Sequence, residues 1–389
     1  MSVLDATMGS TGAEASRLAV IDTDTHVARA DPRDPRVAQF LPQRWRDHLA
    51  LVGFRPAVHE HQFPRQRQFA HRTDSVPPGG GEPGTDPAFA REQLLDAYDM
   101  TAAMINDIGA LAFARGSNNY PLELSIALAR ASNDYHREYW LNHDERWRGS
   151  IIVTIEDTAA AVAEIERCVE LDKRFVQLFI ETRTEWPIGN PRYWPIFEAV
   201  THHDLPIAFH VGSNRHITGT GMPSFYAEEH TSFPLRNFYI VASLIFEGVF
   251  DRFPSLKVAF LELGWSWLVP YMWRMDASWR VLKREVGHLQ RKPSEYAREH
   301  FWFSTQPAEE PEKLEWYRDV FDLFEQFGMG ERLMYSSDYP HWDFDAPSEA
   351  VPSMIDLDAR RRILGENASR LYGIPLRPGS GIDPPSGGA

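Results

Sequence analysis

The fold is decided by Leu18-Ala19-Val20-Ile21-Asp22-Thr23-Asp24-Thr25-His26, an apolar run that turns into alternating carboxylates and an imidazole. Side chains two residues apart on a β-strand share a face, so we expect Asp22, Asp24 and His26 to point the same way. Carboxylates and neutral imidazoles are good ligands for Zn, Mn or Fe, so an Asp-x-His pair at the end of a buried strand suits a divalent cation. A strand that ends in a solvated polar turn is the alternative explanation.

The composition of the chain is that of a globular protein with a large core. Of its 389 residues, 43% are hydrophobic and 12% aromatic, and no apolar run reaches the roughly 18 residues that a membrane span needs. The net charge of −15, from 40 Lys and Arg against 55 Asp and Glu, argues against a nucleic-acid-binding protein. Cys168 is the single cysteine, which excludes an intrachain disulfide and a cysteine-based metal cluster.

The two ends of the chain are predicted to lie outside the folded domain. Residues 1–16 have neither the basic nor the apolar segment of a secretory signal, so we expect a disordered N-terminal tail and a cytoplasmic protein. Residues 375–389 are rich in Pro and Gly and predict a disordered C-terminal tail. Between them, 17–374 is predicted to form one catalytic domain.

Apolar runs alternate with longer amphipathic stretches from residue 102 onward, which is typical of βα units. After the first strand, further strands are predicted at 102–106, 150–155, 175–180, 205–210, 258–262, 301–304 and 333–337. Helices are predicted at 121–142, 158–171, 191–203, 233–250, 267–286, 311–327 and 358–372. Eight strands that alternate with helices predict an α/β protein with a (β/α)8 TIM barrel. A doubly wound sheet would alternate too, but no glycine-rich dinucleotide turn is present in the sequence.

A long insertion, 27–97, follows the first strand and is rich in Pro, Arg and Gly. A connection of this length inside a compact domain is usually functional or disordered, so we expect a lid over the barrel mouth. Within it, His59 and His61 are possible additional metal ligands, although a charged surface loop explains them as well. The glycines at 79–81 follow prolines and not a strand, which argues against a phosphate-binding loop.

Active sites of TIM barrels lie at the carboxyl ends of the strands, and several predicted strands of this chain end in metal-binding residue types. Each of these residues has an ordinary structural explanation, such as a core histidine or the start of a turn. Five of them at the ends of four strands together predict a metal site. These residues are Asp24, His26, His210, Glu262 and Asp338. Asp22 is expected to pack beneath the site rather than to bind the metal.

The sequence resembles the amidohydrolase-related branch of metal-dependent TIM-barrel enzymes over nearly all of 18–374. The resemblance rests on Ile21-Asp-Thr-Asp-Thr-His26, Ala208-Phe-His210, Phe253-Pro-Ser-Leu-Lys-Val258, Ser337-Asp-Tyr-Pro-His-Trp342 and Ile363-Leu-Gly-Glu-Asn-Ala368. It implies that the positions of Asp24, His26, His210 and Asp338 bind one divalent metal, commonly Zn or Mn. It also implies nonoxidative decarboxylation, hydration or lactone hydrolysis.

The chain departs from that family at Glu262, where decarboxylases usually carry a histidine followed by glycines. A third carboxylate can bridge two cations, and carboxylate-rich sites with a few histidines are used for paired iron. In this respect the chain is similar to the TIM-barrel non-haem diiron monooxygenases of platensimycin- and platencin-type antibiotic biosynthesis. That similarity implies two iron ions, dioxygen and a bulky CoA-linked, diterpenoid-type acid as substrate.

The leading hypothesis from the sequence is therefore a diiron monooxygenase. In it, Glu262 and His341 are catalytic, and Trp265 and Trp267 line the substrate pocket. The alternative is a hydrolase or nonoxidative decarboxylase with one Zn or Mn, in which Glu262 acts as general base toward water. A barrel that only binds a ligand is a third possibility, and a homodimer is expected by analogy with the family.

Overall fold

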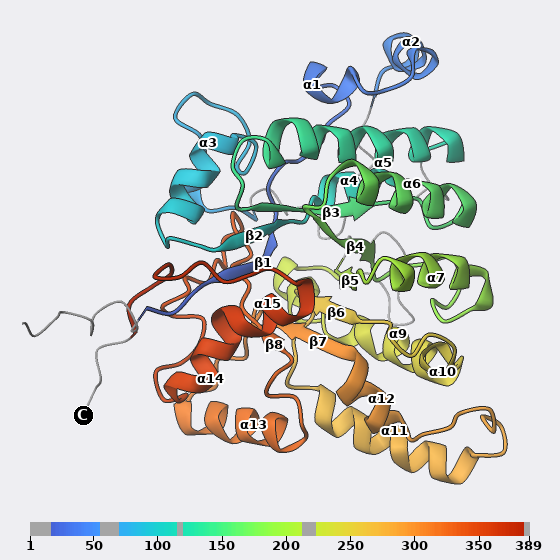
Figure 1. The fold of residues 1–389 in the computed structure, drawn as a ribbon, viewed down its shortest axis with the longest axis vertical. Helices are drawn as coiled ribbons and strands as arrows, with labels where there is room; N and C mark the ends of the chain where they lie inside the picture. The colour runs from blue at the N-terminus through green and yellow to red at the C-terminus, as the bar shows by residue number, and fades with distance from the viewer. Residues whose placement is uncertain (1–16, 55–69, 115–119, 212–222, 385–389) are drawn as a thin grey trace, which may run out of the picture.

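The computed structural model describes residues 17–54, 70–114, 120–211 and 223–384, and it shows a parallel barrel (Figure 1). Its strands pair in sequence order, from β1 to β8. Backbone hydrogen bonds between β1 and the segment after β8 close the sheet: among them, Thr23 N donates to Tyr335 O at 3.0 Å, and Asp338 N donates to Asp24 O at 3.1 Å. The predicted (β/α)8 barrel is confirmed. The strands are β1 (Ile21–Thr25), β2 (Ala102–Ile105), β3 (Trp147–Ile152), β4 (Phe175–Glu181), β5 (Ile207–His210), β6 (Val258–Leu261), β7 (Phe301–Ser304) and β8 (Leu333–Met334).

Helices surround the strands and bury their apolar faces against them (Figure 1). Three π-helical segments, 91–96, 137–141 and 362–366, extend or join these helices. The helices of the first half are α1 (Pro35–Ala38), α2 (Gln43–Val52), α3 (Pro87–Ala90), α4 (Ile108–Ala114), α5 (Leu122–His136), α6 (Thr158–Leu171) and α7 (Trp194–His202). Those of the second half are α8 (Tyr226–His230), α9 (Leu235–Phe246), α10 (Val249–Arg252), α11 (Leu268–Leu282), α12 (Pro293–His300), α13 (Leu314–Gln326), α14 (Leu357–Arg361) and α15 (Asn367–Tyr372).

Several element boundaries differ from the prediction, and two of the differences have clear local physical reasons. β3 begins at Trp147 and not at 150, because Arg148 lies within the strand and only part of its side chain is buried. An arginine can cover apolar surface with its aliphatic stem while its charged end reaches water. A charged residue can therefore lie within a buried strand, and the hydrophobic pattern alone places the start of the strand too late. The predicted helix 233–250 is divided into α9 and α10 at Gly248, whose φ of +76° lies in the left-handed region.

The insertion after β1 is described over residues 27–54 and 70–97, and both parts contact the barrel mouth. Ala28 N donates to Gly84 O at 2.9 Å, and Trp342 N donates to Ala70 O at 2.9 Å. By contrast, α2 has no buried residue and lies away from the barrel, at the top of the view in Figure 1. The predicted ligands His59 and His61 lie outside the described residues, so their place relative to the barrel mouth stays a prediction.

Part of the segment that was predicted to be a disordered C-terminal tail is ordered. Leu18 N donates to Ile382 O at 2.8 Å, and Ile382 N donates to Leu18 O at 3.0 Å. This antiparallel contact places residues around 382 beside the start of β1. Among the described residues, no helix has both the length and the apolar character that crossing a membrane would require.

We predict that Gly365→Ala lowers the free energy of unfolding by roughly 1–3 kcal/mol, the usual cost of overpacking a core. A Cβ at Gly365 would lie 2.5 Å from the backbone oxygen of Ala19, which leads into β1. Gly79→Ala is the matched control, because a Cβ there meets no atom within 4 Å. Urea unfolding followed by circular dichroism measures both variants, and equal stability of the two would contradict the packing described for Gly365.

Candidate metal centre

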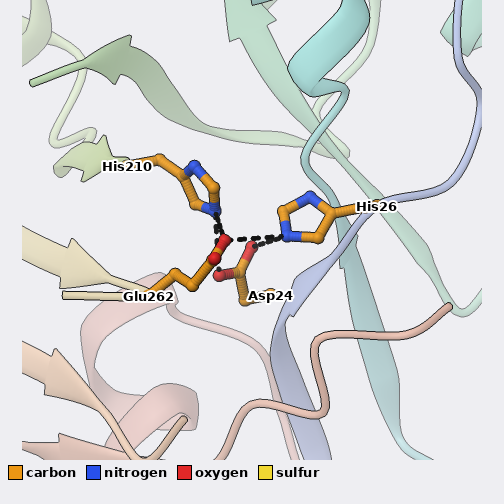
Figure 2. A group of neighbouring side chains, drawn as sticks. All are labelled: Asp24, His26, His210 and Glu262. Carbon is orange, nitrogen blue, oxygen red and sulfur yellow. Dashed lines mark ion pairs between the residues drawn. The ribbon is translucent and has the colours of Figure 1, made fainter. Parts of the chain in front are cut away.

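The structure brings the five predicted ligands together at the carboxyl end of the barrel. Figure 2 shows four of them, from β1, β5 and the end of β6, with their polar atoms pointing toward one another. All five side chains are buried, and none of these residues is more than 4% exposed. The ligand atoms form two overlapping groups, in each of which all atoms lie within 4.8 Å of one another. The first group is Asp24, His26, His210 and Glu262, and the second is His26, Glu262, Asp338 and His341.

Backbone carbonyls fix the tautomers of the two central histidines. His26 Nδ1 lies 2.9 Å from Asn106 O, and His210 Nδ1 lies 2.6 Å from Val211 O. A carbonyl oxygen only accepts, so each Nδ1 carries a proton and the lone pair of each neutral ring is on Nε2. Both Nε2 atoms are buried, and the atoms nearest to them are carboxylate oxygens. They are therefore presented to the centre as metal ligands would be.

The carboxylates present oxygens to the same space. Glu262 Oε2 lies 2.8 Å from His210 Nε2 and 3.5 Å from His26 Nε2, and Asp338 Oδ1 lies 2.8 Å from His26 Nε2. Asp24 Oδ1 accepts from Asn106 Nδ2 at 2.7 Å, whereas its Oδ2 lies 3.5 Å from His210 Nε2. Three buried carboxylates so close together are costly to keep ionised, and a divalent cation binds imidazole nitrogens and carboxylate oxygens at once. The donor set therefore fits Zn or Mn.

Two of the carboxylate residues adopt a backbone conformation that is unusual for residues other than glycine. Glu262 has a φ of +52° and Asp338 a φ of +59°, both in the left-handed region. Such a conformation costs of order 1–3 kcal/mol and persists where the surroundings enforce it. Here Glu262 N donates to Ser304 Oγ at 3.1 Å, and Asp338 N donates to the backbone of Asp24. Hydrogen bonds thus hold both residues in the turns that follow their strands.

Mutual charge interactions control protonation of the centre in the metal-free protein. Burial lowers the pKa of His210, but the carboxylates of Asp24 and Glu262 outweigh it and raise the pKa to about 9. Burial likewise opposes a charge on His26, yet Asp24 and Asp338 raise its pKa well above the usual value. Both imidazoles therefore carry a second proton near neutral pH, and their positive charge compensates the carboxylates when a cation is absent.

His341 lies directly beside the centre. Its Nδ1 is 2.8 Å from Asp338 Oδ1, and its ring stacks on that of His26 with centroids 4.5 Å apart. It is only 5% exposed, and the inserted segment covers it through a backbone bridge to His71. A buried imidazole in hydrogen-bond contact with a carboxylate of the centre can exchange a proton with it, which is compatible with the catalytic role predicted for His341.

A further group of residues beside the centre was missed by sequence reasoning. Gln306 Nε2 lies 3.3 Å from Asp338 Oδ2 and 2.7 Å from Asp343 Oδ2, and Asp343 Oδ2 is 2.9 Å from His230 Nε2. Gln306 follows β7, so the strand-end rule could have found it. Nothing local predicts the contact between His230 and Asp343, which are 113 residues apart.

The two tryptophans predicted to line the substrate pocket pack against aromatic side chains of the surrounding helices. Trp265 is 1% exposed and its ring contacts aromatic residues of α13, with the nearest centroid, that of Phe324, at 5.0 Å. Trp267 Nε1 donates to the backbone of Leu263 and Gly264, and its ring lies against Phe238 at 5.2 Å. Both indoles thus fill the layer between strands and helices, which is the usual place of a large apolar residue after a barrel strand.

These observations define a TIM barrel with a metal-type donor set at the carboxyl ends of its strands. The chain belongs to the amidohydrolase family, whose profile matches residues 21–374. A gamma-resorcylate decarboxylase from Polaromonas sp. is 25% identical over 333 residues, which cover 79% of this chain and 97% of the relative.

Two solved structures are similar in fold. An amidohydrolase from Mycobacterium avium subsp. paratuberculosis has a TM-score of 0.67 at 17% identity, covering 92% of this chain and 98% of that chain. A dihydroxybenzoic acid decarboxylase from Polaromonas sp., solved with bound manganese and the inhibitor 2-nitroresorcinol, has a TM-score of 0.60 at 20% identity, covering 92% of this chain and 97% of that chain.

These comparisons correct the leading hypothesis from the sequence. The prediction of a diiron monooxygenase is wrong, because the relative that matches most of the chain is a decarboxylase. The similar decarboxylase structure contains manganese, and nothing in these relatives supports two irons, dioxygen or a CoA thioester. Glu262 was the residue that led to the error, since a third carboxylate by itself does not imply a second cation.

We predict that Mn²⁺ binding at pH 7 releases protons. His210, with its pKa raised to about 9, and His26 must each lose the Nε2 proton before that nitrogen can bind a metal. As the pH rises from 7 toward 9 these protons leave beforehand, so the apparent affinity increases and the proton release decreases. Titration calorimetry in two buffers of different ionisation enthalpy measures the release.

His300→Gln is the control for this experiment. His300 is buried and stacks on Phe250 with centroids 4.3 Å apart, outside both ligand groups. On binding Mn²⁺, the His300→Gln variant should release as many protons as the wild type, whereas the His210→Gln variant should release fewer. Equal binding enthalpies in both buffers for the wild type at pH 7 would contradict the protonation described for the metal-free centre.

Proposed function

We propose that this protein is a decarboxylase that uses one divalent metal ion, Mn²⁺ or Zn²⁺, and acts on a small hydroxylated aromatic acid. The observation that carries the proposal is the convergence of the buried Nε2 atoms of His26 and His210 on carboxylate oxygens of Asp24 and Asp338. The decarboxylase relatives support the reaction class, and the manganese in one of them supports the metal. Residues 17–374 would form the catalytic domain.

A bound divalent cation would supply electrostatic attraction for the carboxylate and a neighbouring oxygen of the substrate. Asp24, His26, His210 and Asp338 would hold it. All four side chains are buried, so their electrostatic interaction with a cation would be stronger than in water.

The proton that replaces carbon dioxide would come from Asp338 and His341. In decarboxylation the bond between ring and carboxyl carbon breaks, carbon dioxide leaves, and the ring carbon takes up one proton. In the metal-free centre, burial and the charge of Glu262 raise the pKa of Asp338 well above the usual value, which supports a role for its carboxyl group in holding a proton. His341 Nδ1, 2.8 Å from Asp338 Oδ1, is placed to replace the proton after each turnover.

Glu262 supports a second candidate function, metal-dependent hydrolysis. Its carboxylate lies among the candidate ligands, with Oε2 2.8 Å from His210 Nε2, and the charge and hydrogen bond of His210 outweigh burial and hold its pKa well below the usual value. A carboxylate that stays ionised beside a metal can accept a proton from water, as a general base in hydrolysis does.

We predict that the Mn²⁺-loaded protein releases carbon dioxide from 2,6-dihydroxybenzoate or a related hydroxybenzoate under anaerobic conditions. The reaction needs no electron acceptor, so removing dioxygen should leave the rate unchanged. Coupled detection of carbon dioxide, with chromatography of the phenolic product, measures it. Dependence of turnover on dioxygen, or release of a hydrolysis product instead of carbon dioxide, would contradict the proposal.

Two isosteric variants separate the candidate functions. For a decarboxylase, Asp338→Asn should lower kcat by roughly 10²–10⁴-fold, the usual contribution of a proton-transfer group, while Glu262→Gln should lower it by less than about tenfold. For a hydrolase, Glu262→Gln should cause the larger loss. Steady-state kinetics of both variants, with Mn²⁺ content determined in the same samples, decides between them.

A further inference from the structure

A chain of hydrogen bonds runs through the interior of the barrel, from the C-terminal helix to the candidate metal centre. Tyr372 of α15 donates its hydroxyl proton to Gln177 Oε1 at 2.8 Å. Gln177 Nε2 lies 3.0 Å from Asn106 Oδ1 and 2.9 Å from Ser150 Oγ, and Ser150 Oγ donates to Asn106 Oδ1 at 2.5 Å. Asn106 Nδ2 then donates to Asp24 Oδ1 at 2.7 Å. Ser150 lies in β3 and Gln177 in β4, and Asn106 directly follows β2.

This chain has a single direction. Asn106 Oδ1 accepts from both Ser150 and Gln177, which fixes the orientation of the amide and leaves its Nδ2 to donate toward Asp24. A reversed amide would set its NH₂ group against the NH₂ group of Gln177. Every donor in the chain therefore points toward the carboxylate, which favours the ionised form of Asp24 without a counter-charge in the barrel interior.

Asn106 contacts both metal-type residues of β1. Its side chain holds Asp24 Oδ1, and its backbone oxygen accepts from His26 Nδ1 at 2.9 Å. With Oδ1 engaged, Oδ2 of Asp24 is the oxygen left for a cation, and with Nδ1 engaged, Nε2 of His26 is the nitrogen left for it. One residue thus selects the ligand atom of two side chains.

Packing alone does not explain polar residues at these positions. The interior of a TIM barrel is usually filled by branched apolar side chains, and burying an amide costs free energy unless all of its groups are satisfied. Asn106, Ser150 and Gln177 are all completely buried. Apolar residues of similar volume would fill the same space without that requirement.

We propose that Gln177, Ser150 and Tyr372 are positioning residues for metal binding, which act through Asn106 to fix the orientation of Asp24 and His26. The inference rests on the proposed metal centre. It assigns a functional effect to Tyr372, which belongs to the last helix and reaches Asp24 only through the side chains of Gln177 and Asn106.

The test is the Mn²⁺ dissociation constant of Gln177→Met and Tyr372→Phe, measured by titration calorimetry, together with the thermal midpoint of each metal-free variant. Removing an outer partner of a metal ligand typically weakens binding by 10–100-fold, so we expect about tenfold for Gln177→Met and a smaller loss for Tyr372→Phe. Because both act through one chain, the double variant should bind Mn²⁺ no more weakly than Gln177→Met alone.

Tyr296→Phe is the matched control. Tyr296, on α12, also donates its hydroxyl proton to a side-chain oxygen, Asp251 Oδ2 at 2.6 Å. Its hydroxyl group contacts no member of the hydrogen-bond chain that leads to Asp24. It should change the thermal midpoint without changing the dissociation constant.

Dissociation constants within twofold of wild type for both test variants would overturn the inference, even if their thermal midpoints fall, because a purely structural role moves stability alone. If Gln177→Met does not fold, Tyr372→Phe, which removes one oxygen atom, decides the question. A wild-type protein that binds no Mn²⁺ would instead overturn the proposed function and this inference with it.

Discussion

The burial of several ionisable side chains at one end of the barrel is the constraint on which the rest of the structure depends. Asp24, Glu262 and Asp338 bring three carboxylates into contact with two imidazoles, all removed from water. Such groups are costly to bury unless they are paired or bind a cation. The left-handed turns at Glu262 and Asp338 and the carbonyls that orient the imidazoles hold this arrangement in place.

Neutral amides complete the arrangement without adding charge. Asn106 donates to Asp24, and Gln306 lies within hydrogen-bond distance of Asp338, so each of these carboxylates has one oxygen engaged and the other facing the centre. A donor that carries no charge holds a carboxylate in place without competing with a cation for it. The same logic explains why the interior of the barrel contains Gln177 and Ser150 where branched apolar residues are usual.

The sequence predicted the barrel, and it also singled out the residues that the structure brings together at the carboxyl end, because both depend on local patterns. Apolar runs that alternate with amphipathic stretches define βα units, and the strand-end rule then selects Asp24, His26, His210, Glu262 and Asp338. Interactions between distant segments were not predictable in this way. Gln177 lies within a strand that was predicted correctly, yet nothing in that strand shows that its amide meets Asn106 and Tyr372.

Two other expectations depended on contacts that local patterns do not encode. Trp265 was predicted to line the substrate pocket; its ring packs on α13, and no local pattern encodes which helix covers which strand end. Glu262 was taken as the sign of a second metal, although a carboxylate at that position serves equally as a ligand or a base of a one-metal site. The carboxylate of Glu262 correctly indicated a metal-type site, but its role in that site depends on neighbouring side chains whose positions the sequence does not reveal.

We propose that the centre holds one divalent cation between β1, β5 and the turn after β8. An anomalous difference map from crystals grown with Mn²⁺, with data collected at the manganese edge, would locate the cation. We expect a single peak bound by Asp24 Oδ2, His26 Nε2, His210 Nε2 and Asp338 Oδ1. Two peaks within the cluster, or a single peak that does not contact His26 and His210, would contradict it.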